Sequence, residues 1–333
     1  MLRCAQHGRA GSGLLRAVSW QLKALPITQH RADRSLKLIY SDQYDLNLGN
    51  HVFPSIKYRL IKEALLGQGQ AKPEDFVEPP MAADNDVALV HHRDYIRKLQ
   101  TGKLSYPEIL RMEVPYSPEL VRAVWLCAGG SILAGRLALE DGACVNVGGG
   151  FHHAFPDHGE GFCVLNDVAI ALRSLQKDET IQRAMTVDCD AHQGNGTAAI
   201  FAGDPSVFTL SIHQANIYPY PKPPSNLDIN LDDGVDDEEY LGALEEGLDK
   251  SLAEFQPDLI LYLAGADPYC EDQLGGLRLS LEGLEMRDRL VFQKARARKI
   301  PVAVTLAGGY ARRVEDTVLI HITTIRVARE FAS

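Results

Sequence analysis

Short apolar runs alternate with longer stretches of helical periodicity from residue 36 to the end of the chain. Between the runs, segments such as 118–140, 165–176 and 237–255 carry apolar residues at spacings of three and four, as one helix face requires. Strands that alternate with helices predict a parallel sheet covered on both faces. We therefore predict a single-domain, three-layer α/β/α fold with a mostly parallel central sheet. Its strands are expected at residues 36–40, 143–147, 184–188, 207–212, 259–264 and 302–306.

The composition is that of a globular protein, with 333 residues, 45% of them hydrophobic and 23% charged. A formal net charge of −10 argues against direct binding of nucleic acid, because phosphate-backbone affinity depends on Lys and Arg. Six scattered cysteines without a CxxC pair predict a reducing compartment, which favours the cytoplasm. No apolar run in the sequence approaches the roughly 20 residues of a membrane span, so none is expected.

The N-terminal segment differs from the rest of the chain. Residues 1–32 contain five Lys or Arg and no acidic residue. Such a composition is typical of an organelle transit peptide, and the alternatives are an untidy extension or a start assigned too early. We take residues 1–35 as a basic extension outside the fold, and residues 36–333 as the domain.

Polar side chains beside glycines follow five of the predicted strands. The chain reads "ACVNVGGG" into "FHHA", "AMTVDCD" into "AHQGNG", "FTLS" into "IH", "LILYLAG" into "AD" and "VAVTLAGG" into "Y". Ligands of such sheets bind at the carboxyl ends of the strands. These five strand ends are therefore predicted to form one site.

The segment "DCDAH" places Asp188, Asp190 and His192 on alternate residues. In extended backbone such residues point to the same side, and two carboxylates held so close need a compensating cation or proton. Asp190 and His192, with Asp267 from "AGADPY", form a set of one imidazole and two carboxylates that leaves an open position on a catalytic metal. Each residue taken alone is more readily explained as a capping Asp or a core His.

Adjacent His152 and His153 follow a glycine run that allows both rings to face one pocket. Two imidazoles near a metal can divide the proton transfers between a base and an electrostatic stabiliser, with Asp188 and Asn195 available to fix their tautomers. Tyr310, at the end of "LAGGY", can donate a hydrogen bond to an oxyanion. Together these groups predict metal-assisted hydrolysis of an acyl bond.

The motifs "GGGFHHAFPDHGEGFCVLND", "DCDAHQGNG", "LSIH", "AGADPY", "LGGLRLS" and "LAGGYAR" resemble those of the zinc-dependent histone deacetylases of the arginase-deacetylase fold. The resemblance covers about residues 38–331 of the 333. Details such as "ANIYPY", "GNG" and "DQLGGLRLS" are most similar to the class IV branch and its bacterial relatives.

The resemblance implies one zinc ion per chain, held by Asp190, His192 and Asp267. It implies that His153 is the general base and acid and that His152, oriented by Asp188, holds charge in the transition state. Tyr310 would polarise the scissile carbonyl. The resemblance further implies an acyl-lysine channel lined by Gly161 and Phe162. It also implies a structural monovalent cation, usually potassium, held by Asp188, Ser211 and the backbone carbonyls of Asp190, His192 and Ile212.

Three positions depart from the common family pattern. Asn195 stands behind His153, where many members have Asp, and an amide stabilises an imidazolium less than a carboxylate does. The class IV pattern also has Asn here, so tuned activity is expected. Tyr218 falls where other branches have an aromatic channel wall. Leu274 replaces the acidic gatekeeper of polyamine-preferring relatives, which weakens a polyamine hypothesis.

The leading hypothesis is a hydrolase that removes acetyl or longer acyl groups from lysine ε-amines of proteins or peptides. Class IV relatives favour long fatty-acyl groups, so acetyl need not be the best substrate. The alternatives are a hydrolase of small acylated amines, arginase-like chemistry, which needs two manganese ions and more carboxylates, and an acyl-lysine binding module that has lost catalysis.

Overall fold

The computed structural model describes residues 36–332, so the basic extension expected at residues 1–35 lies outside the described part of the chain. Eight strands form one sheet in the order β2-β1-β3-β8-β7-β4-β5-β6, and every pairing is parallel. The strands are β1 (Leu38–Ile39), β2 (Phe76–Val77), β3 (Ala143–Asn146), β4 (Ala184–Asp188), β5 (Val207–Gln214), β6 (Leu227–Leu231), β7 (Leu259–Leu263) and β8 (Val302–Thr305). The predicted parallel α/β architecture is confirmed.

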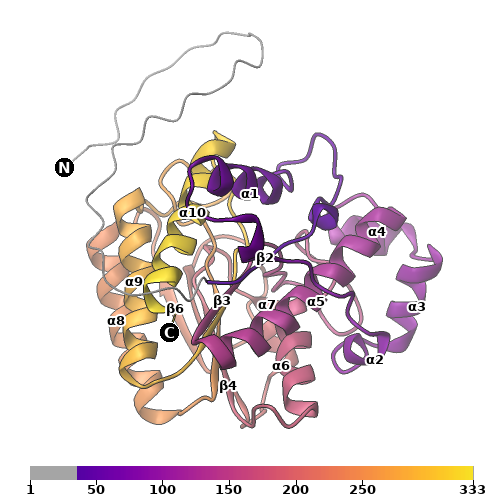
Figure 1. Cartoon of the computed structure of the whole chain (residues 1–333). Helices are drawn as coiled ribbons and strands as arrows, with labels where there is room; N and C mark the ends of the chain where they lie inside the picture. The colour runs from indigo at the N-terminus through magenta and orange to yellow at the C-terminus, as the bar shows by residue number, and fades with distance from the viewer. Residues whose placement is uncertain (1–35, 333) are drawn as a thin grey trace. The chain divides into compact units, whose positions relative to one another are not determined.

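Helices cover both faces of the sheet (Figure 1). They are α1 (Lys57–Gly67), α2 (Asp84–Val87), α3 (Arg93–Thr101), α4 (Tyr106–Met112), α5 (Pro118–Asp141), α6 (Asp167–Lys177), α7 (Asn195–Ile200), α8 (Asp237–Glu254), α9 (Leu281–Ala297) and α10 (Val314–Phe331), with 3₁₀ turns η1 (Asp42–Tyr44) and η2 (Pro73–Asp75). Helices α5 and α6 pack on each other, and α8, α9, α10 and α1 form a second connected group. The two groups lie on opposite sides of the sheet (Figure 1).

Helix α5 corrects one sequence-based expectation. By length and composition it is apolar enough to cross a membrane, contrary to the prediction that no stretch is. Most of its most apolar window is buried against the rest of the fold, including Leu120, Val124 and Cys127. A long helix in the core of an α/β fold has the same composition as a membrane span, because both are surrounded by apolar groups.

The six strands predicted from apolar runs are all present, with ends shifted by two residues or fewer. Strands β2 and β6 were not predicted. β2 has only two residues, and β6, "LDINL", is an edge strand whose polar positions interrupt the apolar pattern. By contrast, every residue of β7 is buried, as expected for a central parallel strand.

All strands point the same way, so their carboxyl ends meet along one edge of the sheet. Asp188, the last residue of β4, pairs with Ser211 of β5 on one side and with Leu263 of β7 on the other. Leu263 in turn pairs with Thr305 of β8, and β8 pairs with β3. The polar segments that follow β3, β4, β7 and β8 are therefore brought together although they are far apart in the sequence.

Candidate active site

Three metal-ligating side chains meet at the carboxyl ends of β4 and β7. The Nδ1 atom of His192 lies 3.2 Å from Oδ1 of Asp190 and 3.1 Å from Oδ2 of Asp267. One ligand atom from each residue falls within 4.8 Å of the others, and all three residues are buried. Glycine is required around them, because a Cβ at Gly308 would approach the carboxylate oxygens of Asp190 and Asp267 to 2.6 Å.

The electrostatics of this group fit a bound cation. Burial, and then the charge of Asp190, raise the pKa of Asp267 to about 8. Burial lowers the pKa of His192, but hydrogen bonds to Asp190 and Asp267 outweigh it and raise that pKa to about 10. Two buried carboxylates in mutual repulsion and a single imidazole are the donor set that a divalent ion such as zinc binds. The residues present therefore fit the metal expected from the sequence.

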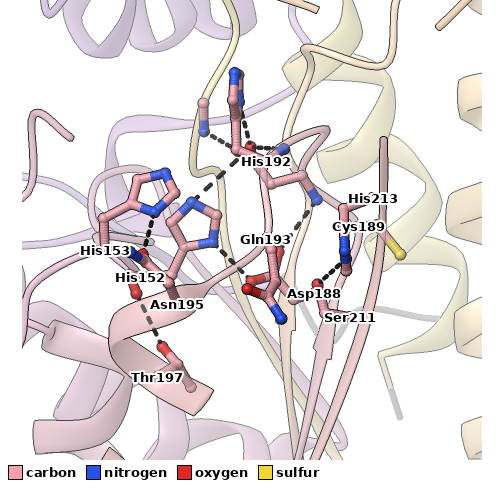
Figure 2. Close-up of polar contacts among 12 residues, drawn as sticks. His152, His153, Asp188, Cys189, His192, Gln193, Asn195, Thr197, Ser211 and His213 are labelled. Carbon is pink, nitrogen blue, oxygen red and sulfur yellow. Dashed lines mark hydrogen bonds and ion pairs between the residues drawn. The ribbon is translucent and has the colours of Figure 1, made fainter. Parts of the chain in front are cut away.

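His152 lies beside this group and has a carboxylate behind it. Its Nδ1 is 2.6 Å from Oδ2 of Asp188, and its Nε2 is 3.9 Å from Oδ1 of Asp190. Burial lowers the pKa of His152, but the charges of Asp188 and Asp190 outweigh it and raise the pKa to about 9. Figure 2 shows this ring next to that of His153, and the ring centroids are 4.1 Å apart.

His153 has an amide behind it instead. Its Nδ1 is 2.7 Å from Oδ1 of Asn195, the first residue of α7 (Figure 2). Because Oδ1 can only accept, the geometry protonates Nδ1 and leaves Nε2 free for a substrate proton. Burial and the neighbouring His152 and His192 hold the pKa of His153 well below its usual value. The ring is thus kept in its neutral form, as a general base requires.

The loop between β3 and α6 carries both histidines, and hydrogen bonds to side chains at the start of α6 hold it in place. The buried carboxylate of Asp167 accepts hydrogen bonds from the backbone N–H groups of Gly150 (3.0 Å) and Phe151 (2.7 Å). Asn166 donates to the backbone carbonyl of Ala154 at 3.2 Å. Polar contacts at the start of α6 therefore hold the orientation of the histidine pair.

Tyr310 closes the opposite side of the site. Its backbone N–H donates to Oδ2 of Asp272 at 2.7 Å, and its ring centroid is 6.3 Å from that of His192. Burial and the charges of Asp190 and Asp267 raise the pKa of Tyr310 well above its usual value, so the phenol keeps its proton. It is therefore available as a hydrogen-bond donor at this site.

A cavity of about 10 Å³, close to the space of one water, lies between these groups. Its lining is formed by residues of the histidine and tyrosine loops and of the chain near the channel: Phe53, Gly150, Phe151, His152, His153, Gly161, Phe162, Cys163, Asp190, Ala307, Gly308 and Tyr310. Gly161 and Phe162 are among these lining residues, and their role as walls of an acyl-lysine channel stays a prediction. Phe53 and Cys163 were not predicted, because an isolated Phe or Cys gives no pattern that distinguishes a pocket wall from the core.

The two remaining predicted channel residues lie differently. The ring centroid of Tyr218 is 5.0 Å from that of His153, and a Cβ at Gly161 would approach the Tyr218 hydroxyl to 2.7 Å. Tyr218 therefore stands beside the predicted channel. Leu274 is partly buried against the core and is not among the residues that line this cavity.

The residues expected around a monovalent cation are next to one another. Asp188 and Ser211 are paired on neighbouring strands, and Ile212 follows Ser211 on β5. The Oγ atom of Ser211 is 2.9 Å from Nδ1 of His213 (Figure 2). The role of this group as a cation site stays a prediction.

Sequence reasoning missed three polar residues around the site. Lys57 of α1 is fully buried and donates to the carbonyl oxygens of Ala307 (2.6 Å) and Gly308 (3.3 Å). Asp272 holds the backbone of Tyr310, as described above. Glu160 lies behind Asn195. Only Glu160 had a local signal, because it immediately precedes Gly161 in the "GEGF" segment.

The parallel sheet, the buried Asp–His–Asp group at its carboxyl edge and the two histidines above it define a deacetylase-type site of the arginase-deacetylase fold. A sequence profile of the histone deacetylase domain matches residues 51–325. The chain belongs to the histone deacetylase family.

Individual relatives are similar over most of this chain. An uncharacterized protein of Picosynechococcus is 42% identical over 280 residues, which cover 84% of this chain and 93% of the relative. Histone deacetylase 2 of Arabidopsis thaliana is 33% identical over 300 residues, covering 85% of this chain and 78% of that one.

Solved structures show the same fold. The structure of an HDAC homolog from Aquifex aeolicus matches with a TM-score of 0.74 and 25% identity, covering 90% of this chain and 84% of that one. An acetylpolyamine aminohydrolase from Burkholderia pseudomallei matches with a TM-score of 0.76 at 20% identity, over 89% and 99% of the two chains. At that identity the second match shows the fold alone.

Proposed function

We propose that this chain is a zinc-dependent amidohydrolase that removes acetyl or longer acyl groups from the ε-amine of lysine in proteins or peptides. The observation that carries the proposal is the meeting of three kinds of group around one cavity. The cavity is lined by Asp190 of the buried Asp–His–Asp set, by the neutral imidazole of His153 with its free Nε2 and by the protonated phenol of Tyr310.

Each protein group has a separate task in this proposal. Zinc held by Asp190, His192 and Asp267 would supply an activated water and polarise the acyl carbonyl. His153 accepts a proton from the attacking water at Nε2 and later donates it to the leaving amine. Through its contact with Asp188, His152 is held where a positive ring stabilises developing negative charge. The Tyr310 hydroxyl donates a hydrogen bond to the carbonyl oxygen as that oxygen becomes an oxyanion.

The residue at position 274, and not the cavity wall, favours an acyl-lysine over a small polyamine. Phe53 and Phe162 line the cavity, with ring centroids 6.4 Å apart, and such apolar walls suit the aliphatic stem of either substrate. Leu274 offers no carboxylate for a second ammonium group. We also propose that a monovalent cation at Asp188 and Ser211 offsets the cost of burying Asp188, whose pKa burial raises.

The test is hydrolysis of one lysine peptide carrying an acetyl, octanoyl or myristoyl group, alongside an N-acetylated diamine. Zinc is supplied, and a parallel series contains a chelator. Chelator-sensitive release of acid from at least one peptide, with little from the diamine, is expected, and the chain-length ranking reports pocket depth. Preferred turnover of the diamine would replace the lysine proposal with a small-amine hydrolase. A zinc-loaded protein that hydrolyses neither would refute both.

A further inference from the structure

Glu160 forms the outer end of a chain of hydrogen bonds that leads to His153. One carboxylate oxygen, Oε1, accepts from the Asn195 Nδ2 amide at 2.8 Å and from the Tyr218 hydroxyl at 2.8 Å. The other, Oε2, lies 3.4 Å from Nε2 of His158. Asn195 itself is buried, and its side chain joins Glu160 on the outside to His153 on the inside.

The chemistry of these groups determines which way each hydrogen bond runs. An ionised carboxylate has no proton to give, so it accepts from the NH₂ of Asn195. That leaves the amide oxygen facing His153, and an oxygen accepts only from a protonated Nδ1. The neutral imidazole then carries no proton on Nε2. The Glu160 carboxylate, two hydrogen bonds from the His153 ring, thus selects the tautomer in which His153 can act as a base.

Glu160 is kept ionised by its own neighbours. The hydrogen bond from His158, together with those from Tyr218 and Asn195, lowers the pKa of Glu160 against the opposing effect of burial. Arg111 adds a more distant positive charge, with Nε 4.0 Å from Oε2. The Glu160 side chain is 21% exposed, so the carboxylate is held by its neighbours and still reaches solvent.

We propose that Glu160 is a positioning residue for the reaction, which fixes the Asn195 amide and through it the tautomer of His153. The inference rests on the proposed function, because it assigns His153 as the base. It also accounts for the amide at position 195. An Asp there would place a second carboxylate 2.8 Å from Glu160, where neither has a proton to share.

The first experiment compares kcat and KM for Glu160→Leu, Glu160→Gln and the control Glu113→Gln on the best acyl-lysine peptide. Glu113 is the control because it is another acidic residue, and its charge and that of Glu160 repel each other. Among the described contacts, the hydrogen bond from Asn195 goes to Glu160 and not to Glu113. We expect Glu160→Leu to lower kcat by about 10- to 100-fold with KM and zinc content little changed, a part of what a general base contributes. Glu160→Gln keeps an oxygen for Asn195, so it should stay within about fivefold of the parent protein. Equal kcat for Glu160→Leu and Glu113→Gln would overturn the proposal.

The second experiment is a double-mutant cycle. Asn195→Asp is made in the parent chain and in the Glu160→Gln chain, where the introduced side-chain amide can donate to the new carboxylate. We expect Asn195→Asp to cost at least about tenfold more kcat in the parent chain than in the Glu160→Gln chain. Equal costs in both backgrounds would show that Glu160 and position 195 are not coupled.

A spectroscopic measurement separates this inference from the proposed function. The ¹⁵N shifts of the His153 ring in the resting zinc-loaded protein report which nitrogen carries the proton, whatever the substrate. The parent protein should show protonated Nδ1, and Glu160→Leu should show a mixture of tautomers. An unchanged tautomer in Glu160→Leu would refute the role of Glu160 even if the enzyme hydrolyses acyl-lysine. The predicted tautomers in a protein without such turnover would support it while refuting the proposed substrate.

Discussion

Two neighbouring histidines in this site have opposite electrostatic characters. His152 is 3% exposed and His153 is 6% exposed, so burial alone does not separate them. The difference comes from the side chains behind the rings. Burial lowers both pKa values. Asp188 and Asp190 overcome burial and raise the pKa of His152 to about 9, whereas burial and the charges of His152 and His192 hold the pKa of His153 well below the usual value despite its hydrogen bond to Asn195.

The comparison shows how one residue type performs two tasks at adjacent positions. A ring backed by a carboxylate favours the charged form, which suits the stabilisation of negative charge. A ring backed by an amide favours the neutral form, which suits the acceptance of a proton. His153 has no carboxylate directly behind its ring, and the structure places one, Glu160, beyond the intervening amide of Asn195.

The largest effect is expected from the metal ligands, on which both rings depend. Asp267→Asn removes a charge that holds the cation, and we expect loss of bound zinc together with a fall in turnover of about 10³-fold or more. Atomic absorption measures the bound zinc, and peptide hydrolysis measures the turnover. Asp258→Asn is the matched control, because Asp258 immediately precedes strand β7, whereas Asp267 follows its carboxyl end, and Asp258 accepts the N–H groups of Gln182 and Arg183. A zinc-free Asp267→Asn with normal turnover would remove the metal from the proposal.

The next largest effect is expected when the carboxylate behind His152 is removed. Asp188→Asn makes the partner of His152 resemble that of His153, while its oxygen can still accept the Asp190 N–H, 3.1 Å away in the parent. The new NH₂ group donates to Nδ1 and removes the charge that stabilises a positive ring. We expect kcat to fall by about 10²- to 10³-fold with zinc retained, the loss typical of removing one group that stabilises an oxyanion. A loss of kcat smaller than that of Glu160→Leu would show that the Asp188 carboxylate matters less to the reaction than Glu160 does, contrary to the roles assigned to His152 and His153.

The smallest effect concerns pH. Asn195→Asp in the Glu160→Gln chain gives His153 a carboxylate, which favours the imidazolium and so raises the pKa of His153. The neutral base is present above its pKa and is lost as pH falls through it. The acid limb of kcat/KM should therefore move to higher pH by about one unit relative to Glu160→Gln alone. A profile that does not move, or moves to lower pH, would show that His153 is not the group titrating on that limb.

Local patterns predicted much of the fold and part of the site. The apolar runs located β3, β4, β5, β7 and β8 because central parallel strands are buried on both faces. They did not locate β6, whose apolar pattern is interrupted by polar residues, nor the two-residue β2. The alternation in "DCDAH" indicated the metal group because its spacing lies within a single segment.

Short segments of sequence were enough to predict the parallel sheet, the Asp190 and His192 pair and the two adjacent histidines, since each depends on residues close together in the chain. The groups behind each ring could be identified only from the folded structure. Asn195 begins α7, Glu160 lies in a loop 35 residues earlier, and Tyr218 comes from a third segment, yet all three share hydrogen bonds. Contacts of this kind depend on how the loops pack at the edge of the sheet, and loop packing leaves no periodic trace in the sequence.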